Sequence, residues 1–155
     1  MDATERAALI GRYRSGVSSV DQALAGIGED ELDRIPPEGW SARMVVHHLA
    51  DSETNAYLRL RKLLAEDDPQ IQGYDEARFA RVLHYDRPIE RSLDVFRAVR
   101  ASSEELLDRL TDADWSRAGT HTESGPYGVE DWLRIYADHA PDHADQIRRA
   151  REGRS

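Results

Sequence analysis

A stretch near the C-terminus places two histidines where an amphipathic helix normally carries apolar side chains. Residues 128–150 read GVEDWLRIYADHAPDHADQIRRA. At about 100° per residue, one face of a helix over this stretch is apolar, and His139 and His143 fall near the middle of that face. Both imidazole rings are therefore expected to face the core. The apolar residues of this face are Val129, Trp132, Tyr136, Ala140, Ile147 and Ala150.

The spacing of these two histidines is typical of metal ligands. Residues four apart on a helix lie about 5 to 6 Å apart, a separation at which two imidazole nitrogens can share one ion. The HxxxH pattern of His139 and His143 thus predicts half of a metal site. The alternative is a pair of core histidines that are satisfied by hydrogen bonds and bind no metal.

The composition limits the class of protein. A chain of 155 residues with 39% hydrophobic content is long enough for one domain with one core, which we assign to residues 1–155. The 30 acidic and 21 basic residues give a formal charge of −9, which repels phosphate backbones and anionic lipids. Nucleic acid and membrane are therefore not expected partners. No apolar run resembles a signal sequence or a membrane span, which favours a soluble, cytoplasmic protein.

The chain has no cysteine. A metal ion would therefore be held by His, Asp or Glu, and any thiol chemistry would need an exogenous low-molecular-weight thiol.

Helical periodicity dominates the chain, and no segment shows the alternation expected of a strand. Two extended connections separate the long helices, which predicts an all-α four-helix bundle with long crossover connections. The helices are expected at residues 4–26, from the Ser41 cap to about Ala65, from Asp86 and Pro88 to near Thr111, and over 128–150.

The two connections are expected to differ. Residues 66–73 form a predicted loop, and residues 74–86 are expected to hold a short helix that Phe79 and Leu83 pack against the bundle. Residues 112–127 are rich in turn-forming residues and are expected to lack regular structure.

Two neighbouring histidines in the second helix differ in their angular positions. Relative to the Val45 and Leu49 stripe, His48 lies about 80° to 90° away and can reach the edge of the core. His47 lies close to the opposite side, which predicts a solvated surface residue.

A carboxylate also lies close to the buried face of the second helix. Glu53 is about 50° from the centre of the apolar stripe, so its charge needs compensation by a metal ion or a buried partner. Arg100, on the apolar stripe of the third helix, could supply that partner in a structural ion pair. Glu53 could instead be a metal ligand, a general base, or an acceptor that orients an imidazole. His121 is a further candidate for the mouth of the site, with an exposed loop histidine as the alternative.

Three segments together resemble one known family. Trp40-Ser41 is followed by His48-Leu49-Ala50-Asp51 and Glu53, then by FRAVRASSEELL at 96–107 and by DWLRIYADHAPDHADQI at 131–147. This arrangement, which covers nearly the whole chain, resembles the DinB/YfiT-like metalloenzymes. The resemblance implies a four-helix bundle with a three-histidine metal site, made here of His48, His139 and His143.

Three imidazole ligands leave a divalent ion with at least one open position, which is typical of catalytic sites. All-nitrogen ligation suits zinc or nickel, and also iron or copper. The resemblance implies a small-molecule substrate and one of three activities, namely thiol-dependent S-transfer, isomerisation or metal-dependent hydrolysis. It also implies a homodimer.

Two alternatives predict different sites. A non-catalytic metal-binding stress or interaction protein predicts a closed site in which Glu53 or another residue fills the fourth position and no cavity adjoins. A bundle with hydrogen-bonded core histidines predicts no metal at all.

Pro141 lies between the two histidines of the fourth helix. It removes one backbone donor and crowds the Ala137 carbonyl, at a cost of roughly 3 kcal/mol in a helix interior. Because both histidines must stay on one face to share an ion, we expect a continuous but bent helix.

Overall fold

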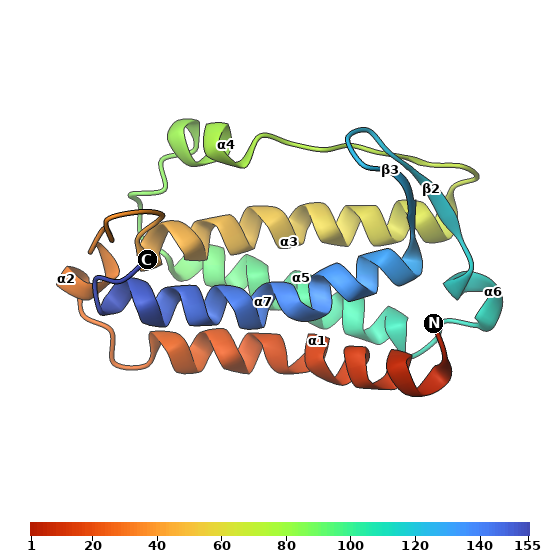
Figure 1. Ribbon diagram of the computed structural model, residues 1–155, viewed down its shortest axis with the longest axis horizontal. Coiled ribbons are helices and arrows are strands. Elements are labelled where there is room, and N and C mark those ends of the chain that lie inside the picture. Colours follow the sequence, from red (N-terminus) through yellow and green to blue (C-terminus); the bar gives the residue numbers. More distant parts are fainter.

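Four long helices form the body of the computed structural model, which describes residues 1–155 (Figure 1). Helix α7 packs against α1 and α3, and α5 packs against α3 and α1. The consecutive long helices α1 and α3 are therefore placed diagonally across the bundle. The long helices are α1 (Ala3–Leu24), α3 (Ala42–Ala65), α5 (Glu90–Leu107) and α7 (Val129–Arg151).

The directions of the helices require one long return of the chain. Helices α3 and α5 run the same way along the bundle, so residues 66–89 travel back over its length between them (Figure 1). This crossover lies outside α3 and carries strand β1 (Gln70–Ile71) and helix α4 (Glu76–Val82). The predicted four-helix bundle with a long crossover is confirmed.

Local sequence signals account for the ends of the long helices. The Ser41 hydroxyl accepts a hydrogen bond from the Met44 amide at 3.3 Å, which is the predicted cap of α3. The Asp2 carboxylate caps α1 in the same way through the Glu5 amide, at 2.8 Å. Helix α1 ends just before Gly26, which adopts a φ of 66° that favours glycine.

The expected absence of strands is wrong. Residues 112–127, predicted to be irregular, contain helix α6 (Asp112–Trp115) and strand β2 (Ala118–His121), and strand β3 (Gly125–Gly128) follows at their end. Strand β2 pairs with β3 in antiparallel fashion and with β1 in parallel. Strands of two to four residues are too short to show an alternating pattern.

Gly119 explains how the crossover and the hairpin can meet. A Cβ atom at this position would lie 2.3 Å from the Pro69 carbonyl oxygen, so only glycine permits the approach. The small sheet therefore ties the crossover to the segment that leads into α7.

Helix α3 is covered on more sides than its apolar stripe predicts. His47 was expected to be solvated but is fully buried: its Nε2 donates to the Arg87 carbonyl at 2.9 Å, and its Nδ1 accepts from the Ser92 hydroxyl at 2.7 Å. The end of the crossover and the start of α5 cover this face and supply both partners. The prediction of a solvated His47 is wrong because α3 has more than one buried face.

The short helix of the crossover packs less firmly than expected. No residue of α4 is buried, and Leu83, predicted to pack it, is 40% exposed. Phe79 packs within the crossover itself, where its ring centroid lies 4.7 Å from that of Tyr74.

Helix α7 continues through Pro141, as predicted. None of the helices is long and apolar enough to span a lipid bilayer.

Candidate metal centre

Three histidines from two helices converge beside the core of the bundle. His48 lies on α3, and His139 and His143 lie one turn apart on α7. One nitrogen of each ring falls within 4.8 Å of those of the other two. The ring centroids are 4.6 Å apart for His139 and His143, and 4.7 Å apart for His48 and His143. The structure thus brings together the three residues that the family resemblance implied.

Hydrogen bonds orient two of the rings. The Nδ1 of His143 donates to the Gln146 side-chain oxygen at 2.7 Å, and the Nδ1 of His139 donates to the Glu53 carboxylate at 3.0 Å. In each ring the Nε2 atom therefore keeps a lone pair for another partner. In His139 this atom lies 3.2 Å from the Ser52 hydroxyl.

Glu53 lies beneath the histidines and is 1% exposed. The same oxygen that accepts from His139 also accepts from Arg100 Nη1 at 2.6 Å. Arg100 is itself fully buried, and its other terminal nitrogen donates to the Tyr13 carbonyl. Glu53 therefore makes the predicted ion pair with Arg100 and also orients an imidazole. It is not part of the three-histidine cluster and lines no cavity at the site.

Burial keeps two of the rings in the form that can bind a metal. Burial, reinforced by the neighbouring histidines, lowers the pKa of His48 to about 3. Burial followed by the nearby His139 lowers the pKa of His143 to about 4. Both rings are therefore neutral at pH 7 and offer lone pairs.

These features fit a divalent metal ion. The Nδ1 of His48 is buried without a hydrogen-bond partner, so this ring is held in the cluster by packing rather than by a polar contact. A core histidine that serves only packing would be expected to satisfy its ring nitrogens, as His47 does. The donor set of three imidazoles is one that zinc and neighbouring transition metals accept.

Two cavities meet at the cluster. One, of about 360 Å³, exposes all three histidines and is also bordered by Trp40. The other, of about 200 Å³, extends from His139 toward the small sheet. Glu76 of α4 and His139 line both.

His121 lies in the second cavity. It is 8% exposed on strand β2, so it is not the exposed loop histidine that was the alternative. Pairing of β2 with the crossover strand β1 brings it to the site.

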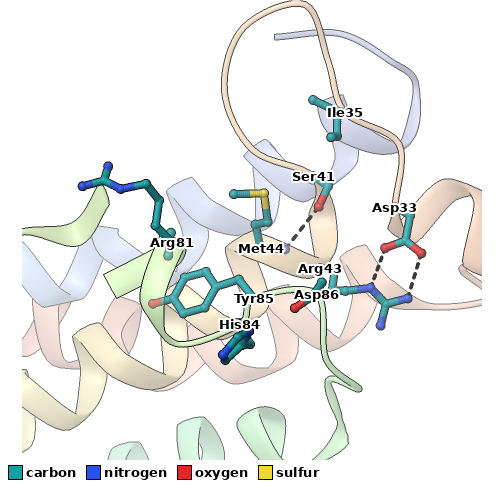
Figure 2. A pocket seen from close by; sticks show the side chains of 10 residues that line it. Asp33, Ile35, Ser41, Arg43, Met44, Arg81, His84, Tyr85 and Asp86 are labelled. Atoms are coloured by element: carbon teal, nitrogen blue, oxygen red, sulfur yellow. Dashed lines mark hydrogen bonds and ion pairs between the residues drawn. The ribbon is translucent and has the colours of Figure 1, made fainter. Parts of the chain in front are cut away.

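The largest cavity of the protein, about 510 Å³, is elsewhere (Figure 2). It lies between α4 and the start of α3, and none of the three histidines lines it. Of its two arginines, Arg43 is turned onto the Asp33 carboxylate and is therefore already paired. We assign it no role in the chemistry.

The sequence contained signals for two residues of the site that were missed. Gln146 follows His143 by three residues and Ser52 follows His48 by four, spacings at which helical side chains meet. Glu76, Tyr74 and Arg59 carried no such signal, because only the folded crossover brings the first two to the cavity that Arg59 borders.

Proteins with similar sequences bear names that refer to a metal-dependent activity. A protein of Oceanobacillus iheyensis is 40% identical over 109 residues, which cover 70% of this chain and 63% of that protein. A protein of Halalkalibacterium halodurans is 30% identical over 134 residues, which cover 86% of this chain and 78% of its own length. Each bears the name "putative metal-dependent hydrolase". The match thus spans less than two thirds of the first relative and more than three quarters of the second.

A solved structure supports the fold. YfiT from Bacillus subtilis aligns with a TM-score of 0.89 and 28% sequence identity, over 100% of this chain and 91% of YfiT. It is described as "a probable metal-dependent hydrolase with an unusual four-helix bundle topology". Residues 13–147 match the model of the DinB superfamily, and the chain therefore belongs to the DinB superfamily, with the four-helix bundle of YfiT.

Proposed function

We propose that the chain is a metal-dependent enzyme that holds a divalent ion through His48, His139 and His143 and acts on a small molecule, with hydrolysis as its reaction. The observation that carries the proposal is the cavity of about 360 Å³ onto which all three histidines open. A site with three protein ligands and free space beside them is typical of catalytic metals. The names of the relatives support hydrolysis.

The surrounding residues would prepare the histidines for this task. Glu53 and Gln146 accept the Nδ1 protons of His139 and His143, which leaves a lone pair on each Nε2 atom for a metal ion. Arg100 compensates the buried charge of Glu53. A divalent ion bound there would supply Lewis acidity, which makes water or a thiol a better nucleophile near neutral pH.

Glu76 is the best placed group for proton transfer. Its carboxylate is exposed and borders both cavities, whereas the Glu53 carboxylate is sealed beneath the histidines. We therefore assign Glu76 the role of general base and Glu53 a positioning role.

Thiol-dependent S-transfer or isomerisation is the second candidate function. Two cavities that meet at one ligand offer separate places for a thiol and an acceptor. The chain contains no cysteine, so the thiol would be an exogenous low-molecular-weight compound. A requirement for added thiol in a substrate screen would favour this reaction, and turnover with water alone would favour hydrolysis.

The non-catalytic alternative is less well supported. A metal-binding stress or interaction protein requires no open space beside the ion, and the cavity at the histidines argues against a closed site.

Elemental analysis of protein purified without a histidine tag tests the site. We expect about one divalent ion per chain, zinc or nickel first and iron or copper next, and loss of most of it in His143→Ala. His84→Ala is the control, because His84 is exposed and outside the cluster. Metal-free wild-type protein, or equal loss in both variants, would contradict the proposed ligands.

A further inference from the structure

The second cavity brings together several groups that donate hydrogen bonds, and two carboxylates, Glu76 and Glu123, also border it. It lies next to His139 and encloses about 200 Å³, enough for roughly six water molecules at their liquid volume. Arg59 of α3, Tyr74 of the crossover and His121 of β2 reach it from three separate segments. We call these three residues, with the space they border, the donor subsite.

Arg59 is held in place but not neutralised. Its Nη1 donates to the Tyr136 hydroxyl at 3.0 Å and its Nη2 to the Gln72 carbonyl at 2.8 Å. Both partners are uncharged, and the Nε of Arg59 is buried with no partner. A guanidinium with spare donors and a fixed orientation is suited to bind a carboxylate through two parallel hydrogen bonds.

The other two groups also have protons to offer. The Tyr74 hydroxyl is buried and unpaired, although Ser52 lies near it. Burial raises the pKa of Tyr74, so the hydroxyl keeps its proton. In His121 the Nδ1 accepts from the Glu123 amide at 3.2 Å, which leaves the Nε2 as a donor.

Two donors of this subsite, the Arg59 Nε and the Tyr74 hydroxyl, are buried without partners. Such donors are costly in a folded protein, so the pair indicates a missing acceptor. We propose that the donor subsite binds the carboxylate of a small monocarboxylic substrate whose reacting part lies at the three histidines. This inference names a substrate class and rests on the proposed function only for the identity of the reacting centre.

The charges around the cavity select among anions. Glu76 and Glu123 border the same space, so a doubly charged phosphate would be repelled more strongly than a singly charged carboxylate. Ile135, which is 50% exposed, lies at the cavity and offers an apolar contact for the carbon chain of the substrate.

The test uses metal-free protein, because a carboxylate can also bind directly to a metal ion. Butyrate is titrated into chelator-treated protein, and binding is followed by amide chemical shifts. We expect saturable shifts around Arg59, Tyr74 and His121, and weaker binding of inorganic phosphate at equal concentration.

Three variants test whether butyrate binds at the donor subsite. Tyr74→Phe should weaken butyrate binding about tenfold, since it removes one hydrogen bond to a charged group. Arg59→Gln should weaken it more, since it removes a positive charge and two hydrogen bonds. Arg61→Gln is the control on the same helix: Arg61 lines neither cavity at the histidines and contacts Ser102 of α5. It should leave binding unchanged.

Tyr74→Phe also distinguishes a loss of butyrate binding from a loss of folding. Because the hydroxyl has no partner in the free protein, its removal should leave thermal stability unchanged or raise it while butyrate binding falls. No saturable binding, binding only to metal-loaded protein, phosphate as tight as butyrate, or equal loss in Arg61→Gln would each overturn the subsite. Failure to find a bound metal would refute the proposed function and leave this result standing.

Discussion

Glu53 accepts hydrogen bonds from the fully buried Arg100 and the partly buried His139 through one oxygen, so a change at this residue affects both partners. Replacing it with Gln leaves the Arg100 charge buried without a counter-charge, which should cost about 3 to 5 kcal/mol in stability. Metal affinity should also fall, roughly 10- to 100-fold, since His139 loses its anionic acceptor. Urea denaturation and metal competition measure the two effects.

The double variant Glu53→Leu/Arg100→Leu separates these effects. It removes both buried charges, so it should be more stable than Glu53→Gln. Metal affinity should stay low in both. Equal stability of the two variants would show that the ion pair is not what the single substitution breaks.

Among the helices, the contact of α1 with α7 depends on Gly16. A Cβ atom there would lie 2.8 Å from the Cβ of Ala140 and 2.7 Å from Arg100 Nη2. Gly16→Ala should therefore destabilise the protein by about 1 to 3 kcal/mol, despite the better helix propensity of alanine. Gly11 of the same helix has no atom near that position, so Gly11→Ala should stabilise by roughly 0.5 to 1 kcal/mol. Urea denaturation of both variants measures these changes. If both substitutions changed the free energy of unfolding in the same direction, the prediction would be wrong.

Helix α7 should respond locally to metal removal. Pro141 leaves the Ala137 carbonyl without its helical donor, and the proposed ligands lie on both sides of this point. We expect chelation to speed hydrogen exchange of amides 138–144 more than those of α1, because bound metal holds the bend that we predict there. A uniform response, or none, would mean that the fold holds this helix without help from an ion.

For the molecule as a whole, the buried histidines should make the metal-free protein acid-sensitive. Folding lowers the pKa of His48 to about 3 and that of His143 to about 4. Below the unfolded value of about 6.5, the unfolded chain therefore binds protons that the folded chain does not bind. The free energy of unfolding is therefore highest above pH 6.5. It decreases as the pH falls, by up to about 1.4 kcal/mol per pH unit for each ring. His47 and His121, whose pKa values are also lowered by burial, act in the same direction.

Denaturation of chelated protein between pH 7 and pH 5 measures this slope. A free energy of unfolding that stays constant over this range would contradict it.

We also expect a homodimer, because the surface keeps large apolar side chains exposed, including Leu58 at 53% and Ile35 at 71%. Sedimentation should give twice the 17.6 kDa chain mass at micromolar concentration. A 17.6 kDa species would contradict the expectation.

The local pattern of residues was enough to predict the four long helices and part of the site. His139 and His143 share a face because they are four residues apart on one helix, and the Ser41 cap depends on an amide three residues away. Such relations are set by helix geometry and can be calculated without knowing the fold. The approach of His48 to the other two was implied by the family resemblance, because no local rule joins residues more than ninety positions apart.

Tertiary structure decided which surfaces are covered. His47 is buried because the crossover and the start of α5 pack over it, and strand β1 exists because the crossover meets the β2–β3 hairpin at Gly119. The donor subsite likewise forms only where α3, the crossover and β2 come together. Helical periodicity describes one helix and one face at a time, whereas the burial of a polar side chain depends on which distant segment packs against it.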